Sequence, residues 1–170
     1  MDKLLPPSMQ ESNSHSITFH QAAPTDAPLL LSVILRAYAE FWGNLTPRSG
    51  AFAETAETID EKLKKGGAIK ALAGTETVGT VLYEPHAAFM YFGRLAVLPE
   101  WRRLGIAKGL ILAVEESARH AGLARVQIGV RLVLASHQDY YMALGYEPIA
   151  YECHPGFTEP TSVTMEKALR

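Results

Sequence analysis

Hydrophobic and polar residues recur along this chain with two different periods, which separate strands from helices. Alternation with a period of two, as at Ile17 and Phe19, predicts strands, and a spacing of four, as between Ile59 and Leu63, predicts helices. The predicted elements are a strand at 17–19, a helix from 24 to about 42, a loop at 43–50, a helix at 54–65, strands at 68–73, 78–84 and 88–98, a helix at 105–121, a strand at 125–130, a helix at 135–144, and strands at 146–151 and 162–169. This order, βααβββαβαββ, predicts an α/β (α+β mixed sheet) domain with a central, mostly antiparallel sheet and one parallel crossover.

Composition narrows the classes of function. The chain has 170 residues and a formal net charge of −2, so it lacks the positive field that non-specific nucleic-acid binding needs. Its one cysteine, Cys153, excludes an internal disulfide and a cysteine-based zinc cluster and fits a reducing cytoplasm. The six histidines are scattered, and no apolar stretch resembles a signal peptide or a membrane span. We therefore expect a cytoplasmic protein with no metal, no nucleic acid and no membrane partner.

The N-terminal segment differs in composition from the rest. Residues 1–15 are rich in Ser, Gln, Asn and Pro and show no periodicity, which predicts a flexible tail. A single domain is then predicted at 16–170.

The most informative stretch is the turn between the strand at 88–98 and the helix at 105–121. A helix N-terminus leaves backbone N–H groups unpaired and carries about half a positive charge, which together attract an anion. Gly105 and Ala107 keep this turn bare, and basic side chains surround it at Arg102, Arg103 and Lys108. The turn is therefore predicted to admit a diphosphate, although the same residues also suit an ordinary turn with solvated arginines and close helix packing.

Two segments resemble a known family. Val97-x-Pro99-x-x-Arg102-x-x-Gly105-x-Ala107 resembles the acetyl-CoA-binding signature of the GNAT superfamily of N-acetyltransferases, and Tyr141-x-x-Leu144-Gly145-Tyr146 resembles the family's Tyr-x-x-Leu-Gly-Phe. The resemblance implies the GNAT-like acyl-CoA N-acyltransferase fold, with the sheet splayed between strands 4 and 5 and the pantetheine arm of acetyl-CoA in the gap. The implied cofactor-binding residues are Leu95, Ala96, Val97, Arg102, Arg103, Leu104, Gly105, Ile106, Ala107, Lys108 and His137.

The resemblance also implies a mechanism, in which a substrate amine attacks the thioester carbonyl directly within a ternary complex. Tyr141 holds the position of the family's usual donor to the departing sulfur, and a packed core tyrosine is the alternative. Many relatives carry a glutamate on the strand before the signature, but residues 90–96 contain no carboxylate. The general base is therefore unassigned, and the groups that could relay a proton, or simply be solvated, are Glu40, Glu84, His86 and Tyr91.

The acceptor side is defined by few residues. Arg94 should border the acceptor groove, where it would either bind a substrate carboxylate or close a structural ion pair. Trp42 is a candidate wall of the pocket, or a core aromatic, and Glu84 is a third candidate for substrate binding. His137, where several relatives have an asparagine, would bond the pantetheine or cap its own helix.

We therefore predict an acetyl-CoA-dependent N-acetyltransferase that needs no metal. No basic docking surface and no acidic track is visible, which favours a small primary amine as acceptor over a protein N-terminus or lysine. The alternative is a non-catalytic acyl-CoA-binding or regulatory module, which the missing carboxylate favours and Tyr141 disfavours. The apolar first helix and the C-terminal hairpin allow a homodimer.

Overall fold

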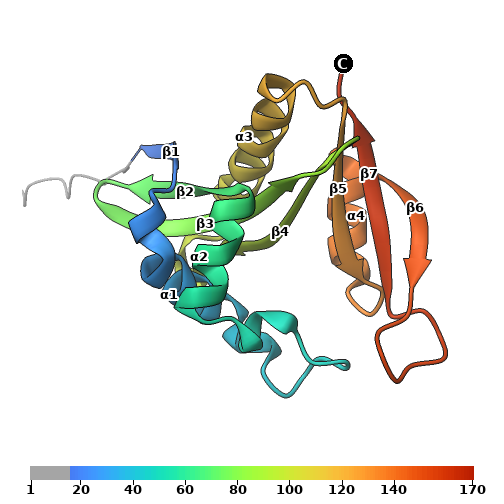
Figure 1. Cartoon of the computed structure of the whole chain (residues 1–170). Coiled ribbons are helices and arrows are strands. Elements are labelled where there is room, and N and C mark those ends of the chain that lie inside the picture. The colour runs from blue at the N-terminus through green and yellow to red at the C-terminus, as the bar shows by residue number, and fades with distance from the viewer. Residues whose placement is uncertain (1–15) are drawn as a thin grey trace, which may run out of the picture.

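A computed structural model describes residues 16–170 (Figure 1). The predicted tail at 1–15 lies outside the described residues. The helices are α1 (Ala27–Tyr38), α2 (Ala56–Lys65), α3 (Ile106–His120) and α4 (Ala135–Ala143), with short 3-10 helices at Pro24–Asp26, Ala39–Phe41, Gly50–Ala53 and Pro99–Trp101. The strands are β1 (Ile17–Gln21), β2 (Gly67–Ala73), β3 (Glu76–Pro85), β4 (Met90–Val97), β5 (Arg125–Arg131), β6 (Glu147–Glu152) and β7 (Ser162–Ala168). The predicted element order is confirmed.

The seven strands form one mixed sheet that opens in the middle. Their order is β1-β2-β3-β4-β5-β7-β6, so the last strand inserts between β5 and β6. Among the strands of residues 16–170, only the β4–β5 pair is parallel, and its register ends at Phe92 opposite Ile128. Beyond that pair the two strands diverge (Figure 1). The predicted splay between strands 4 and 5 is therefore confirmed.

Helices cover both faces of the sheet. α1 and α2 pack on one face, and α3 and α4 on the other (Figure 1). Because successive strand residues point to opposite faces, Ala68 of β2 joins the core under α1 and α2, whereas Ile69 joins the core under α3. None of the helices in residues 16–170 has the length and apolar character needed to cross a membrane.

A buried polar cluster ties α3 to the C-terminal strands. Glu115 of α3 is almost fully buried and accepts hydrogen bonds from the Tyr146 hydroxyl at 3.0 Å and from Lys167 Nζ at 2.9 Å. A buried carboxylate is tolerated because it is paired and hydrogen-bonded in this way. The cluster also fixes the ring of Tyr146, whose centroid lies 5.8 Å from that of Tyr141.

Candidate active site

A cavity of about 890 Å³ occupies the opening in the sheet. Its walls are the separated ends of β4 and β5, the C-terminal end of α1 with the loop after it, the turn before α3, and α4.

The end of β4 turns backbone groups toward the gap. Leu98 donates its backbone N–H to Val78 O of β3 at 2.9 Å. Backbone groups alternate in direction along a strand of an antiparallel pair, so those of Leu95 and Val97 face away from β3. Two side-chain contacts agree with this direction, since the Tyr38 hydroxyl donates to Leu95 O at 3.1 Å and Arg102 Nε donates to Val97 O at 3.2 Å. This edge is therefore directed at the cavity, while the side chain of Ala96 is buried in the core beneath α1.

The turn before α3 is bare in the way that an anion site requires. Arg103 and Gly105 have left-handed backbone conformations, with φ of 62° and 78°. Gly105 is the N-cap of α3 and supplies no side chain to its first N–H groups, and a Cβ placed on it would meet nothing within 4 Å. The first amides of α3 are therefore open to a ligand.

The predicted cofactor residues around this turn occupy different environments. Arg103 and Ala107 line the cavity. Ile106 is buried in the core, so its backbone is the part that is available to a ligand. Leu104 and Lys108 are exposed and lie outside the cavity lining.

Arg102 braces the turn. Besides its bond to Val97 O, it donates from Nη2 to Ala37 O at 2.9 Å, and its Nη1 lies 2.7 Å from the Glu40 carboxylate. One guanidinium thus joins the end of α1 to the end of β4. Its charge is paired with that of Glu40, so of the three basic residues predicted around the turn, Arg102 is the one engaged by a described carboxylate at this site.

Tyr141 lies on α4 with its side chain buried and reaches the cavity lining. Its ring is held among three aromatic rings, those of Phe92, Tyr140 and Tyr146, at centroid distances of 6.2, 5.7 and 5.8 Å. Its hydroxyl has no hydrogen-bond partner among the described residues. Burial raises the pKa of Tyr141 well above its ordinary value, so the hydroxyl is a neutral donor at physiological pH.

Two of the four candidate general bases line the cavity, and two do not. Glu84 and His86 lie outside the cavity lining, whereas Tyr91 and Glu40 line it and Glu40 is paired with Arg102. Loss of solvent contact lowers the pKa of His137, which also lines the cavity, so its imidazole is neutral at pH 7.

His137 does not cap α4 with its side chain. The N-cap of that helix is Leu134, and no side chain hydrogen bond closes it. The imidazole instead makes an edge contact with Phe41, at a centroid distance of 6.2 Å. Within residues 16–170, no three His, Cys, Asp or Glu side chains gather as a metal site requires.

Of the residues predicted to bind the acceptor, Arg94 lines the cavity, whereas Trp42 and Glu84 do not. Arg94 lines the cavity and donates from Nε to Glu54 Oε1 at 2.8 Å, so the ion pair considered from the sequence is present. Trp42 lies outside the lining, with Arg48 stacked on its ring at 3.8 Å and Phe52 packed against its edge.

Sequence reasoning missed Arg131, which lies at the end of β5 and lines the same cavity. Its Nη2 donates to Arg48 O at 3.0 Å and so joins β5 to the loop after α1. The only signal in the sequence was an arginine directly after the predicted strand at 125–130.

A family comparison agrees with this arrangement. Residues 32–146, more than half of the chain, match the model of the acetyltransferase (GNAT) family. The chain belongs to this family. A search of curated proteins finds no match.

Solved structures share the fold of this GNAT protein at low sequence identity. PaiA N-acetyltransferase from Thermoplasma acidophilum, solved with coenzyme A, aligns with a TM-score of 0.74 and 18% identity over 90% of this chain and 99% of that one. The ribosomal-protein-S18-alanine N-acetyltransferase from Escherichia coli gives 0.74 and 16%, over 91% and 94% of the two chains. A GNAT family acetyltransferase from Elizabethkingia anophelis with acetyl-CoA bound gives 0.66 and 17%, over 94% and 100%.

Proposed function

We propose that this GNAT protein is an acetyl-CoA-dependent N-acetyltransferase that acts on a small primary amine. One observation carries the proposal: Arg103 and Ala107 of the turn before α3, the edge of β4 at Leu95 and Val97, and Tyr141 all line one cavity. Two structural neighbours, from T. acidophilum and E. anophelis, were solved with coenzyme A and acetyl-CoA respectively, which supports the same cofactor for this chain.

The cofactor would lie along the backbone rather than among side chains. Its diphosphate would accept hydrogen bonds from the amides that follow Gly105, with Arg103 and Lys108 adding positive charge. The pantetheine arm would pair with the backbone of Leu95 and Val97 at the open edge of β4. In this placement the thioester points toward Tyr141.

The reaction is a direct transfer. The neutral amine attacks the thioester carbonyl carbon, a C–N bond forms, and the C–S bond then breaks with its electron pair left on sulfur. Tyr141 donates a hydrogen bond to that sulfur. Because burial raises the pKa of Tyr141, full proton transfer to a thiolate would be uphill, so a hydrogen bond is the contribution we assign to this residue. The proton lost by the amine passes to water, since no carboxylate base is assigned.

Two measurements test the proposal. Calorimetry with coenzyme A should show binding, and a panel of primary amines mixed with acetyl-CoA should release thiol at a rate above that of acetyl-CoA alone. No heat with coenzyme A would overturn the assignment of the cofactor. Binding without turnover on any amine would instead support the non-catalytic acyl-CoA-binding module.

A further inference from the structure

Two arginines, Arg94 and Arg131, line the end of the cavity where β4 and β5 have separated. Arg94 lies two positions after Phe92, and Arg131 lies three positions after Ile128, where Phe92 and Ile128 form the last pair between β4 and β5. The charge of Arg94 also acts on Arg131, so one small anion bound at this end of the cavity would lie near both guanidinium groups.

Arg131 has an unmet hydrogen-bonding capacity. Its Nη1 is buried and has no hydrogen-bond partner within residues 16–170, while Nη2 is used by Arg48 O. Arg131 also forms no ion pair with a described carboxylate. Burial lowers its pKa, and the nearby charge of Arg94 lowers it further. A guanidinium without a carboxylate partner is costly to bury, and an anion bound beside it would offset its charge.

Arg94 is held in place by the surrounding backbone and by one carboxylate. It has a left-handed conformation, with φ of 51°, at the irregularity in the β3–β4 register. A bulge of this kind re-aims a side chain. Its guanidinium also lies against Gly50, where a Cβ would come within 2.9 Å of Nη2.

The charges at this end leave an excess of positive charge. Glu54, which is buried, is shared between Arg94 and Lys62. Glu152 also lines the cavity, and its Oε1 accepts a hydrogen bond from the Thr164 hydroxyl at 2.9 Å. Against these two carboxylates stand four cations, which are Lys62, Arg94, Arg131 and Arg48, the last stacked on Trp42. Positive charge therefore exceeds negative charge at this end of the cavity.

We propose that the acceptor of the acetyl group is an amine that also bears a carboxylate, and that Arg94 and Arg131 bind this carboxylate. The proposal rests on the proposed transferase function and narrows its substrate class to amino acids and related amino carboxylates. A guanidinium presents a planar fork of donors that matches a carboxylate, which favours this anion at a paired-arginine site. With the carboxylate held there, the amine is free to point along the gap toward the thioester.

The experiment compares matched acceptors. Glycine, β-alanine, 4-aminobutyrate and a set of larger α-amino acids are each assayed beside the corresponding carboxamide, with acetyl-CoA and thiol release as the readout. O-phosphoethanolamine serves as an amine with a phosphate in place of the carboxylate. Calorimetry of each acid and amide with the coenzyme A complex gives binding without requiring turnover.

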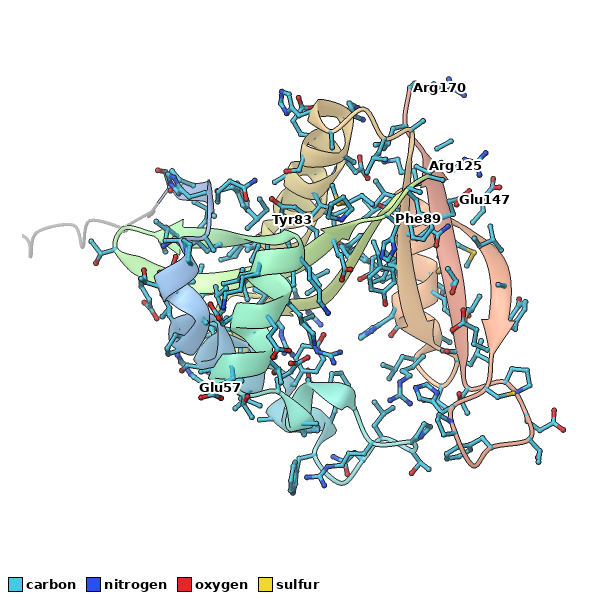
Figure 2. The ribbon with its side chains drawn as sticks, viewed as in Figure 1. Glu57, Tyr83, Phe89, Arg125, Glu147 and Arg170 are labelled. Atoms are coloured by element: carbon cyan, nitrogen blue, oxygen red, sulfur yellow. The ribbon has the colours of Figure 1, made fainter. Side chains whose placement is uncertain are left out.

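Arg131→Gln is the decisive variant, because it removes the charge that has no carboxylate partner and leaves Glu54 paired. Its matched control is Arg125→Gln, which removes the same charge from the opposite end of β5, where Figure 2 shows Arg125 far from the cavity end of the strand. Arg131→Lys tests whether charge alone is sufficient. Thermal unfolding of all three variants checks that each is folded.

We expect kcat/KM for at least one acid to exceed that for its amide about tenfold. Arg131→Gln should lower kcat/KM for that acid about 10- to 100-fold and should change kcat/KM for the amide about twofold or less. Arg125→Gln should behave as the parent, and Arg131→Lys should recover only part of the loss.

Turnover with amides equal to or above that with acids would overturn the proposal and leave the transferase function intact. A preference for O-phosphoethanolamine over every acid would overturn the choice of carboxylate. Without turnover, acid binding that Arg131→Gln abolishes would still support the site, and equal or absent binding of acids and amides would reject it.

Discussion

The two ends of the cavity are built by different means. At the cofactor end, the edge of β4 and the turn before α3 belong to one continuous stretch, 95–107, and present mainly backbone groups. At the acceptor end, side chains come from segments far apart: Arg94 meets Glu54 across 40 residues, and Arg131 meets Arg48 across 83. A backbone site changes little when surface residues are exchanged, whereas a site of converging side chains changes with each substitution. The first end of the cavity is thus formed mainly by backbone groups, and the second by side chains that only the fold brings together.

The largest effect is expected where the two ends meet, at Tyr141. Tyr141→Phe removes the hydroxyl that would stabilise the leaving sulfur and should lower kcat about 100-fold. The affinity for coenzyme A should change about twofold or less, because the ring and its packing are retained. Steady-state kinetics and calorimetry measure the two quantities.

Tyr140→Phe is the matched control for this variant. Tyr140 is adjacent, also lines the cavity and is more exposed, but it has no role in the proposed reaction. An equal loss of kcat in both variants would remove Tyr141 from the mechanism.

The second test breaks the backbone site at the cofactor end. Gly105→Val places a β-branched side chain at a left-handed position and a Cβ beside the proposed diphosphate site, and should weaken coenzyme A binding about tenfold. Gly122→Val is the control, because Gly122 has a similar φ of 74°, also has open space for a Cβ, and follows α3 at the end opposite to Gly105. Both variants should lose stability to a similar extent, as seen by thermal unfolding. Equal coenzyme A affinity in the two would show that the amides after Gly105 do not bind the diphosphate.

The contrast between the two ends also explains what could be predicted from the sequence. The turn at 98–107 was visible because its glycine, small residues and arginines lie in one short segment. The splay followed from the resemblance that the same segment carries. Arg131 was missed because it comes to line the same cavity as Arg94 only when β4 and β5 pair. No local sequence pattern encodes that pairing.

Side-chain direction was the other limit of sequence reasoning. An arginine beside a predicted anion site suggests a phosphate contact, yet Arg102 is directed to two backbone carbonyls and to Glu40. A tryptophan at a helix end suggests a pocket wall, yet Trp42 packs with Arg48 and Phe52 outside the cavity. Both outcomes depend on the loop after α1, whose path hydrophobic periodicity does not determine.

A third test separates two arginines that are adjacent in the sequence. Arg102→Gln removes donors from the carbonyls of Val97 and Ala37 and should lower the free energy of unfolding by about 1 kcal/mol. Arg103→Gln should leave stability unchanged, weaken coenzyme A binding about threefold and reduce its dependence on salt. Urea unfolding and calorimetry at two salt concentrations provide the data. The opposite pattern would make Arg102 the phosphate ligand and Arg103 the brace.

The smallest effect is a pH dependence at the acceptor end, carried by Glu54. Burial on its own would raise the pKa of this carboxyl, but hydrogen bonds from Lys62, Thr58 and Arg94 lower it below its ordinary value of 4.5. A carboxyl with a lowered pKa in the folded state stabilises the fold fully above its unfolded pKa, and that stabilisation is lost as the pH falls through the folded pKa. As the pH falls from about 5.5 to about 3, the parent should therefore lose more unfolding free energy than Glu54→Gln, whose side chain does not titrate. Glu61→Gln, at an exposed position on α2, should follow the parent. Parallel curves for the parent and Glu54→Gln would mean that the cluster holding Arg94 is not maintained by charge, and the acceptor end would then resemble the cofactor end more closely than the structure indicates.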